Sequence, residues 1–381
     1  MSDATLDALP RVAPDATLNA VAHAVPRANP DATPHATTTA SGDAPPGAMH
    51  VAKPGLLSTV QDIGRYGYQR LGVPVNGVMD EWSHRIANTL VGNGPDAASL
   101  ESTLVGPAVW FDRDVLIALT GADMQASIDY VPAPRQRALL VRRGAMLRFG
   151  SCVKGARGYL AVRGGFAVEP VLASRSTFVR GGFGGVEGRA LQTGDRVALG
   201  SADIGYPILH AALQRGTAPF VAGPALDVAP HPALLSALRF TRGPQWPDFT
   251  RAAQRCFTRE LYRIHARSDR MGYRLEGPAL QLRAAREMIS EPVDFGTVQI
   301  PPDGQPIVLM ADRQGAGGYP KIAHVISTDL PALAQALPGA RVGFDEVDHA
   351  AAERAYLDNE DALAALRTAV RMTLREVPAA R

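Results

Sequence analysis

Short apolar runs separated by turn residues fill most of the chain after residue 50. In three segments a turn glycine is followed by period-2 alternation, which is typical of half-buried strands in a barrel or sandwich. The alternating segments are residues 144–149, 194–199 and 339–344, and the continuous apolar runs are residues 115–119, 138–141, 159–162 and 307–310. This pattern predicts a mainly β protein.

Helical periodicity is limited to a few segments, so we expect only short helices. One apolar stripe, which covers three helical turns, is formed by Met79, Trp82, Ile86 and Leu90. Asp80 lies where an acid favours the first turn of that helix. Asp329 and Pro331 predict the start of a second short helix. A third helix is expected within residues 350–381, with its cap at Asp358 or Asn359.

A weak internal repeat organises the chain. Residues 65–72 align without gaps on residues 270–277 and share arginine, glycine, tyrosine and glycine. Downstream, Glu101 and Glu291 each lead through a glycine and an apolar strand to an Ala-Asp pair that ends at Asp123 or Asp312. We interpret this as an internal duplication that produced two related β domains.

The predicted organisation has four parts. They are a disordered tail (residues 1–48), an N-terminal β domain (49–203), a C-terminal β domain (219–349) and the C-terminal helix (350–381). The tail repeats Asp-Ala-Thr, lacks aromatic residues and cannot bury enough apolar surface to offset its ordering entropy. It also lacks the basic start and apolar core of a secretory signal, so we expect a cytoplasmic protein.

Composition excludes several classes of function. The 381 residues carry 39 basic and 37 acidic side chains, a net charge of +2, which argues against a nucleic-acid partner. An apolar run of about 18 residues is absent, so we expect no membrane association. The 2 cysteines cannot build a disulfide framework. The glycine motifs of P-loops and dinucleotide sites and the nucleophile elbow are also absent.

The densest polar segment is glycine-rich and covers residues 174–189. Its candidate phosphate- or substrate-binding residues are Arg175, Arg180, Arg189, Gly182, Gly184 and Gly185. Glycines let backbone N–H groups converge on an anion, and arginines add forked donors. The alternative interpretation is a long hairpin loop with solvated arginines.

A second polar segment, residues 312–321, directly follows an apolar strand. Asp312, Gln314, Tyr319 and Lys321 bring a carboxylate, an amide, a phenol and an ammonium group to a strand end, which suits substrate orientation. The alternative is a turn with ordinary polar side chains.

A third group contains Gln61, Asp62 and Arg65, in which Asp62 either contributes to a site or pairs with Arg65 to hold a turn. Glu101 and Glu291 each precede a strand and are interpreted as buried acids paired with Arg65 and Arg270. Such pairing keeps a carboxylate ionised, and a structural role is as well supported as a catalytic one.

Several ordered phrases carry a family resemblance. They are GLLSTVQDIGR (55–65), LGVP (71–74), TGAD (120–123), GYLAV (158–162), SRST (174–177), RMGYRL (270–275) and QIPPDG (299–304). From about residue 51 to 347 the chain resembles the biotin-dependent carboxyltransferase C–D domain family, also called allophanate hydrolase subunit 2. The bacterial stand-alone members of this family are 5-oxoprolinase C subunits. The family usually reads Gln-Thr-Thr-Gly-Gly-Tyr-Pro where this chain has QGAGGYP (314–320).

The resemblance implies two tandem cyclophilin-like β-barrel domains. It further implies a cytoplasmic subunit that works with A and B subunits to cleave 5-oxoproline to glutamate, using ATP and, by expectation, Mg²⁺. One alternative is a carboxyltransferase component of a biotin-dependent urea carboxylase or allophanate system, although the chain has no Met-Lys biotinylation site. Another is a non-catalytic regulatory partner of the B subunit.

A mechanism follows from the resemblance as a hypothesis. Phosphorylating the lactam oxygen would make the ring carbon open to attack by water, and a small anionic substrate would lie in a cleft shared by both barrels. Arg175, Arg180 and Arg189 are assigned to anions, and Asp123 and Asp312 to a metal or water. The remaining candidates for substrate orientation are Gln314, Tyr319 and Lys321, and the metal ligands stay unknown.

Overall fold

The computed structural model describes residues 47–201, 206–228, 237–284 and 288–375, all within the compact unit of residues 43–381. The predicted tail, residues 1–48, lies outside the described residues apart from its last two. Ala48 is already the first residue of strand β1. The last six residues of the predicted C-terminal helix also lie outside.

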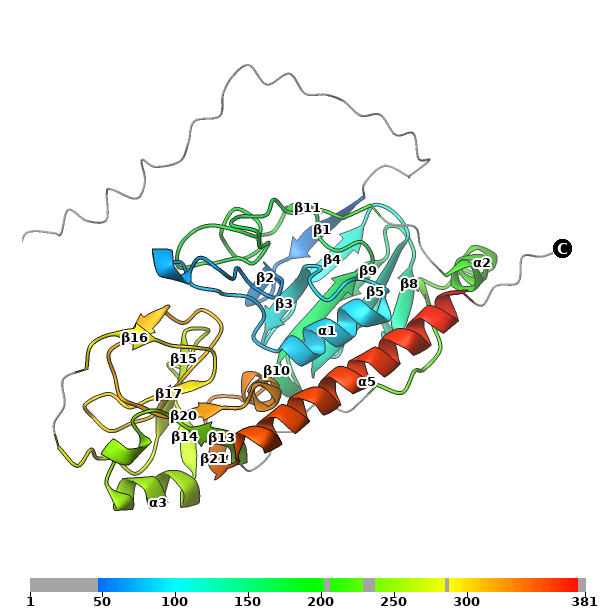
Figure 1. Cartoon of the computed structure of the whole chain (residues 1–381). Helices are drawn as coiled ribbons and strands as arrows, with labels where there is room; N and C mark the ends of the chain where they lie inside the picture. The colour runs from blue at the N-terminus through cyan, green and yellow to red at the C-terminus, as the bar shows by residue number, and fades with distance from the viewer. Residues whose placement is uncertain (1–46, 202–205, 229–236, 285–287, 376–381) are drawn as a thin grey trace, which may run out of the picture. The chain divides into compact units, whose positions relative to one another are not determined.

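The N-terminal half consists of two six-stranded sheets that share one hydrophobic core (Figure 1). The first sheet has the order β11-β1-β4-β9-β6-β7, with β1 Ala48–Lys53, β4 Ala108–Phe111, β6 Ser127–Ile128, β7 Val131–Pro132, β9 Met146–Arg148 and β11 Arg196–Ala198. The second has the order β12-β8-β5-β10-β3-β2, with β2 Leu57–Gln61, β3 Ser99–Thr103, β5 Val115–Asp123, β8 Ala138–Val141, β10 Lys154–Val162 and β12 Phe220–Ala222.

The second sheet is buried on both faces, which explains its continuous apolar runs. In β5, Val115, Ile117 and Leu119 face the shared core, whereas Leu116 and Ala118 belong to a second cluster with helices. The helices of this cluster are α1 Glu81–Leu90, α2 Pro207–Arg215 and α5 His349–Arg375. Figure 1 shows α1 and α5 side by side over this sheet.

The C-terminal half is a closed barrel of seven strands in the order β13-β20-β17-β18-β15-β14-β21. Its strands are β13 Ala237–Arg242, β14 Tyr262–Ile264, β15 Gly272–Glu276, β17 Thr297–Gln299, β18 Ile307–Leu309, β20 Lys321–Val325 and β21 Arg341–Glu346. A two-stranded ladder, β16 Glu291–Pro292 with β19 Ala316–Gly317, lies beside it. The remaining helices are α3 Arg251–Arg259, α4 Leu330–Ala334 and the short 3-10 turns η2 Gln69–Leu71, η3 Trp246–Asp248 and η4 Ser327–Asp329.

The mainly β prediction is confirmed. The predicted pair of barrels is realised as one closed barrel and one pair of facing sheets. Each alternating segment overlaps a strand, and α1 begins after Asp80, whose carboxylate accepts a hydrogen bond from Ser83 N at 2.9 Å. The cap expected at Asp358 or Asn359 is wrong, because α5 already begins at His349. In its first turns most side chains are exposed, so no apolar stripe marks that start.

Helix α5 connects the two halves. It follows the barrel strand β21, and its Leu363, Leu366 and Val370 pack in the cluster beside α1. Arg85 of α1 forms an ion pair with Glu360 of α5 at 2.5 Å. None of the helices in the described part of the chain has the length and apolar character needed to cross a membrane.

Candidate functional site

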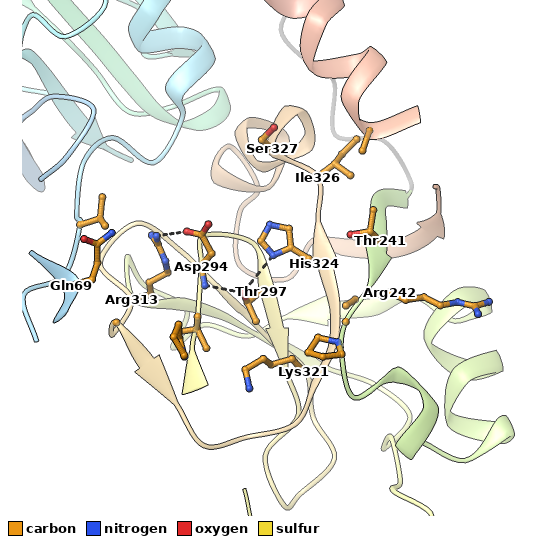
Figure 2. A pocket seen from close by; sticks show the side chains of 18 of the residues that line it. Gln69, Thr241, Arg242, Asp294, Thr297, Arg313, Lys321, His324, Ile326 and Ser327 are labelled. Atoms are coloured by element: carbon orange, nitrogen blue, oxygen red, sulfur yellow. Dashed lines mark hydrogen bonds and ion pairs between the residues drawn. The ribbon is translucent and has the colours of Figure 1, made fainter. Parts of the chain in front are cut away.

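A cleft of about 840 Å³ is lined by residues from both halves of the molecule. The N-terminal half contributes Tyr66, Gln69 and Val75. The polar lining from the C-terminal half consists of Thr241, Arg242, Asp294, Thr297, Arg313, Gln314, Lys321, His324, Ser327 and His349. Figure 2 shows His324 and Arg313 on opposite sides of Asp294 and Thr297. Two of the predicted residues, Gln314 and Lys321, line this cleft, whereas the predicted Arg175, Asp123 and Tyr319 do not.

An irregularity in β20 brings Lys321 and His324 to the same cleft. Val298 pairs with Ala323 and Gln299 pairs with Lys321, so Ile322 is an extra residue in the ladder. A bulge of this kind changes which side chains share a face. Ile322 and Ala323 both join the barrel core, and Lys321 lines the cleft with His324, three positions away.

Two ion pairs hold the cations of the cleft. Lys321 Nζ donates to Glu291 Oε2 at 2.7 Å, and Arg313 Nη2 donates to Asp294 Oδ1 at 2.6 Å. The Arg313 guanidinium also lies over the ring of Phe295, 5.7 Å from its centroid. Burial lowers the pKa of Arg313, but an arginine stays protonated in proteins. The cleft wall therefore holds two buried cations, each paired with an acid.

His324 supplies a group that can exchange a proton. Its burial lowers the pKa of the imidazole, with the charge of Asp294 opposing this effect. Its Nδ1 lies 3.5 Å from Thr297 Oγ1. Because the pKa falls below its usual value near 6.5, the ring is neutral at neutral pH and can accept a proton there. Burial also raises the pKa of Tyr66, with the Glu81 charge adding to the rise.

A buried polar network lies behind the cleft and contains Asp312, Arg270 and Glu101. Arg270 donates to both oxygens of Asp312 at 2.9 Å and to the Glu101 carboxylate. Asn76 Nδ2 donates to Asp312 Oδ1 at 2.8 Å. With both oxygens engaged by these donors, Asp312 is fixed in the interface between the halves and is not among the residues that line the cleft.

The predicted acid–base pairs are exchanged in the structure. The sequence predicts Arg65 as the partner of Glu101, but Glu101 is paired with Arg270. Arg65 instead donates to Asn76 Oδ1 and to the carbonyl of Ser176, and burial lowers the pKa of its guanidinium. The predicted Glu291–Arg270 pair is replaced by Glu291–Lys321. Both predictions assumed partners within one repeat, whereas Arg270 pairs across the two halves.

The glycine-rich segment and the 61–65 segment are brought together, but around Asp62 and not around a cleft. The Asp62 carboxylate accepts hydrogen bonds from Ser174 Oγ and Ser176 Oγ, each at 2.6 Å, and from the backbone N–H of Arg175. Gln61 Nε2 donates to Thr59 Oγ1 at 3.0 Å and to the carbonyl of Thr177 at 3.1 Å. Asp62 therefore holds one loop against another.

The geometry of residues 174–189 favours the hairpin alternative over an anion cradle. The amides of Gly182 and Gly185 donate to carbonyls of the same loop. At Gly184, where φ is +72°, an added Cβ would lie 2.1 Å from the carbonyl oxygen of Ser176, so this glycine permits close packing. Arg189 is paired with Asp195 at 2.8 Å, and Arg180 is exposed.

Three further predicted residues lie away from the cleft lining. Arg175 Nε donates to the carbonyl of Val168 at 3.1 Å. Asp123, at the end of β5, lies 3.8 Å from Arg135. Tyr319 is 45% exposed and lines a separate, mostly apolar pocket of about 800 Å³. The roles predicted for these residues stay predictions, and the structure does not bring them together with Gln314 and Lys321.

Metal binding finds no ready-made site among the residues described. The described part of the chain contains no group of three or more His, Cys, Asp or Glu side chains that could hold a metal ion. Because the donor set is incomplete, we derive no step of the chemistry through a metal bound by this chain alone.

Sequence reasoning missed most of the cleft. Arg313 lies within the polar segment 312–321, next to Asp312, but it is not among the residues predicted for the site. Asp294, Thr297 and His324 come from strands or strand ends with no motif. Tyr66 and Gln69 fall within residues 65–72, the first copy of the internal repeat. The alignment of this copy with residues 270–277 is the sequence signal that covers them.

Known proteins resemble the chain over most of its length. A family model described as the carboxyltransferase domain, subdomain A and B, matches residues 71–346. The C subunit of 5-oxoprolinase from Haemophilus influenzae is 37% identical over 313 residues, which cover 82% of this chain and 96% of that protein. The protein of the same name in Escherichia coli is 36% identical, covering 82% of this chain and 95% of that protein. The crystal structure of the K. lactis urea amidolyase superposes with a TM-score of 0.73 at 29% identity, covering 86% of this chain and 20% of that one.

Proposed function

The chain belongs to the carboxyltransferase domain family (subdomains A and B), and from that membership we propose that it is the C subunit of an ATP-dependent 5-oxoprolinase. The observation that carries this proposal is the share of each relative's length that this chain matches. The chain matches 96% and 95% of two stand-alone 5-oxoprolinase C subunits but only 20% of a urea amidolyase. In this proposal it acts in the cytoplasm with A and B subunits, in a complex that cleaves 5-oxoproline to glutamate.

The cleft supports this proposal chemically. A lactam resists hydrolysis because amide resonance lowers the electrophilicity of its carbonyl carbon. The lactam oxygen would attack the terminal phosphorus of ATP and displace ADP. Water would then add to the ring carbon, the C–N bond would break, and a second water would release phosphate from the resulting acyl phosphate. Arg313 would bind the substrate carboxylate, and Lys321 would face the anionic group that forms on the lactam oxygen. Gln314 would orient the lactam amide by hydrogen bonds, and neutral His324 would exchange a proton with water.

Two alternatives use the same cleft differently. Similarity to urea amidolyase favours a carboxyltransferase that receives a carboxyl group from a biotin carrier. A non-catalytic role, in which the chain only regulates the B subunit, would leave the cleft without a substrate. The cleft cations and the buried histidine favour a catalytic role, because a purely regulatory surface does not require buried charge.

Reconstitution tests the proposal. The purified chain is combined with separately purified A and B subunits, and glutamate release from 5-oxoproline is followed with and without ATP. We expect ATP-dependent glutamate formation only when all three proteins are present. Turnover by A and B alone at the full rate would contradict a catalytic requirement. Carboxylation of urea in the presence of a biotin carboxylase, without oxoproline cleavage, would favour the carboxyltransferase alternative.

A further inference from the structure

The two cleft cations are neutralised by acids from one short segment. Glu291 and Asp294 lie three residues apart, and the residues between them, Pro292 and Val293, line the cleft. Glu291 pairs with Lys321 at 2.7 Å and Asp294 pairs with Arg313 at 2.6 Å. The segment therefore delivers two carboxylates to two cations that come from other parts of the barrel.

Exposure differs sharply within each pair. The side chains of Lys321 and Arg313 are each 6% exposed, whereas those of Glu291 and Asp294 are 46% and 75% exposed. A buried cation needs a counter-charge, because leaving it unpaired costs several kcal/mol. An acid on the solvent side can return to water at small cost. The acids are thus exchangeable counter-ions, and the cations are the fixed part of the site.

The other charged groups of the cleft do not add to the buried positive charge of Lys321 and Arg313. The Arg242 guanidinium is bound to Glu346 at 2.8 Å and lies over Trp246, and Figure 2 shows it directed away from His324 and Arg313. His324 is neutral at neutral pH because its burial lowers its pKa. The buried charge that a ligand would meet is therefore two positive groups.

We propose that the cleft selects small dianions, whose two anionic groups replace Glu291 and Asp294 on Lys321 and Arg313. This inference rests on the proposed function and extends it. 5-Oxoproline carries one negative charge, whereas a phosphorylated substrate or the product glutamate carries a second acidic group. The cleft is then complementary to the substrate after it has gained its second anionic group, which is the condition for differential binding along the reaction.

Calorimetry on the full chain at constant ionic strength tests the inference. The dianionic probes are glutarate, a dicarboxylate, and 3-phosphonopropionate, which carries a carboxylate and a phosphonate. Glutamate, whose two carboxylates are accompanied by an ammonium group, is measured beside them. The monoanionic probes are butyrate and 5-oxoproline. We expect at least one dianion to bind at least tenfold more tightly than both monoanions. Tighter binding of 3-phosphonopropionate than of glutarate would assign the site to the phosphorylated state, and the reverse order to the dicarboxylate product.

Substitutions distinguish a binding site from a structural ion pair. Glu291→Gln and Asp294→Asn remove the competing charges, and each is expected to tighten dianion binding about three- to tenfold. Lys321→Met is expected to abolish the preference for dianions while butyrate binding changes less than twofold. Glu276→Gln, which removes an exposed acid 3.9 Å from Arg263, is the matched control and should change nothing.

Equal affinity for the two classes of probe, binding of neither class, or weaker dianion binding by Glu291→Gln would overturn the inference. None of these results affects the reconstituted reaction. Complexes that still cleave 5-oxoproline would then retain the proposed function without a dianion-selective cleft.

Discussion

The guanidinium of Arg270, which precedes β15 of the barrel, donates to the carboxylate of Glu101 in β3 of the N-terminal half. The same guanidinium binds Asp312 with two hydrogen bonds of 2.9 Å. Arg270 is only 8% exposed and Glu101 only 2%. The two halves are therefore joined by a desolvated cation between two desolvated carboxylates, directly behind the cleft.

Replacing Arg270 should destabilise the whole chain strongly. Arg270→Met leaves Glu101 and Asp312 buried without their main counter-charge, and breaking a buried pair in this way costs about 3–5 kcal/mol. Urea unfolding followed by circular dichroism measures the loss. Arg274→Met, at an exposed position of β15, serves as the control and should cost less than about 0.5 kcal/mol. Similar losses for both variants would show that the central cation does not stabilise the interface.

Substitutions of Arg313 and of Arg175 test whether catalysis takes place in the cleft or in the glycine-rich loop. Arg313 lines the cleft, whereas the Arg175 side chain donates to the carbonyl of Val168. In the reconstituted complex, Arg313→Met should lower kcat/KM about tenfold to a hundredfold, the effect of losing one charge-assisted hydrogen bond of roughly 1.5–3 kcal/mol. Arg175→Ala should change kcat/KM less than threefold. The reverse order would restore the loop as the anion site.

Two glycines that lie two positions apart should respond differently to an added methyl group. At Gly315 a Cβ would meet only Gln69, with its nearest atom 3.5 Å away. At Gly317 it would lie 2.3 Å from Nε2 of Gln299, a side chain that is 2% exposed. Gly315→Ala should therefore leave the free energy of unfolding unchanged within about 0.5 kcal/mol, and Gly317→Ala should lower it by about 1–3 kcal/mol. A loss at Gly315 equal to that at Gly317 would contradict this packing.

Local sequence patterns predict the strands and helices better than they predict the residues of the cleft. The run in β5 was recognisable because Leu116 and Ile117 face different apolar clusters, so every position is apolar. The start of α1 was recognisable because the Asp80 cap bonds only three residues along the chain. Signals of this kind depend on neighbours in sequence, and they can be found without knowing the tertiary structure.

The site depends on relationships that local pattern does not contain. Strict alternation places Lys321 and His324 on opposite faces of a strand, and only the extra residue Ile322 puts both in the cleft. Arg270 pairs with Glu101 across 169 positions, so the duplication suggested the wrong partner. Such contacts are set by how the two halves pack, which one sequence does not reveal.

Acid should destabilise the protein through His84 before the carboxylates titrate. His84 is fully buried in α1, with Nδ1 2.8 Å from Ser99 Oγ and Nε2 3.1 Å from the carbonyl of Pro95. Burial lowers the pKa of its imidazole in the folded state. Below the unfolded value of about 6.5, the unfolded chain then binds a proton that the folded chain does not, so stability is complete above that pH and falls as the pH decreases below it.

Urea unfolding at pH 7.5 and 5.5 measures this effect. The wild type should be less stable at pH 5.5, and part of the difference should disappear in His84→Gln, which itself loses about 1–3 kcal/mol at pH 7.5 because Ser99 and the Pro95 carbonyl lose a partner. His210→Gln, at an exposed position of α2, should keep the wild-type pH dependence. His324, whose pKa is also lowered by burial, accounts for a remaining slope of the same sign. An unchanged difference between the two pH values in His84→Gln would show that this imidazole does not resist protonation in the folded state.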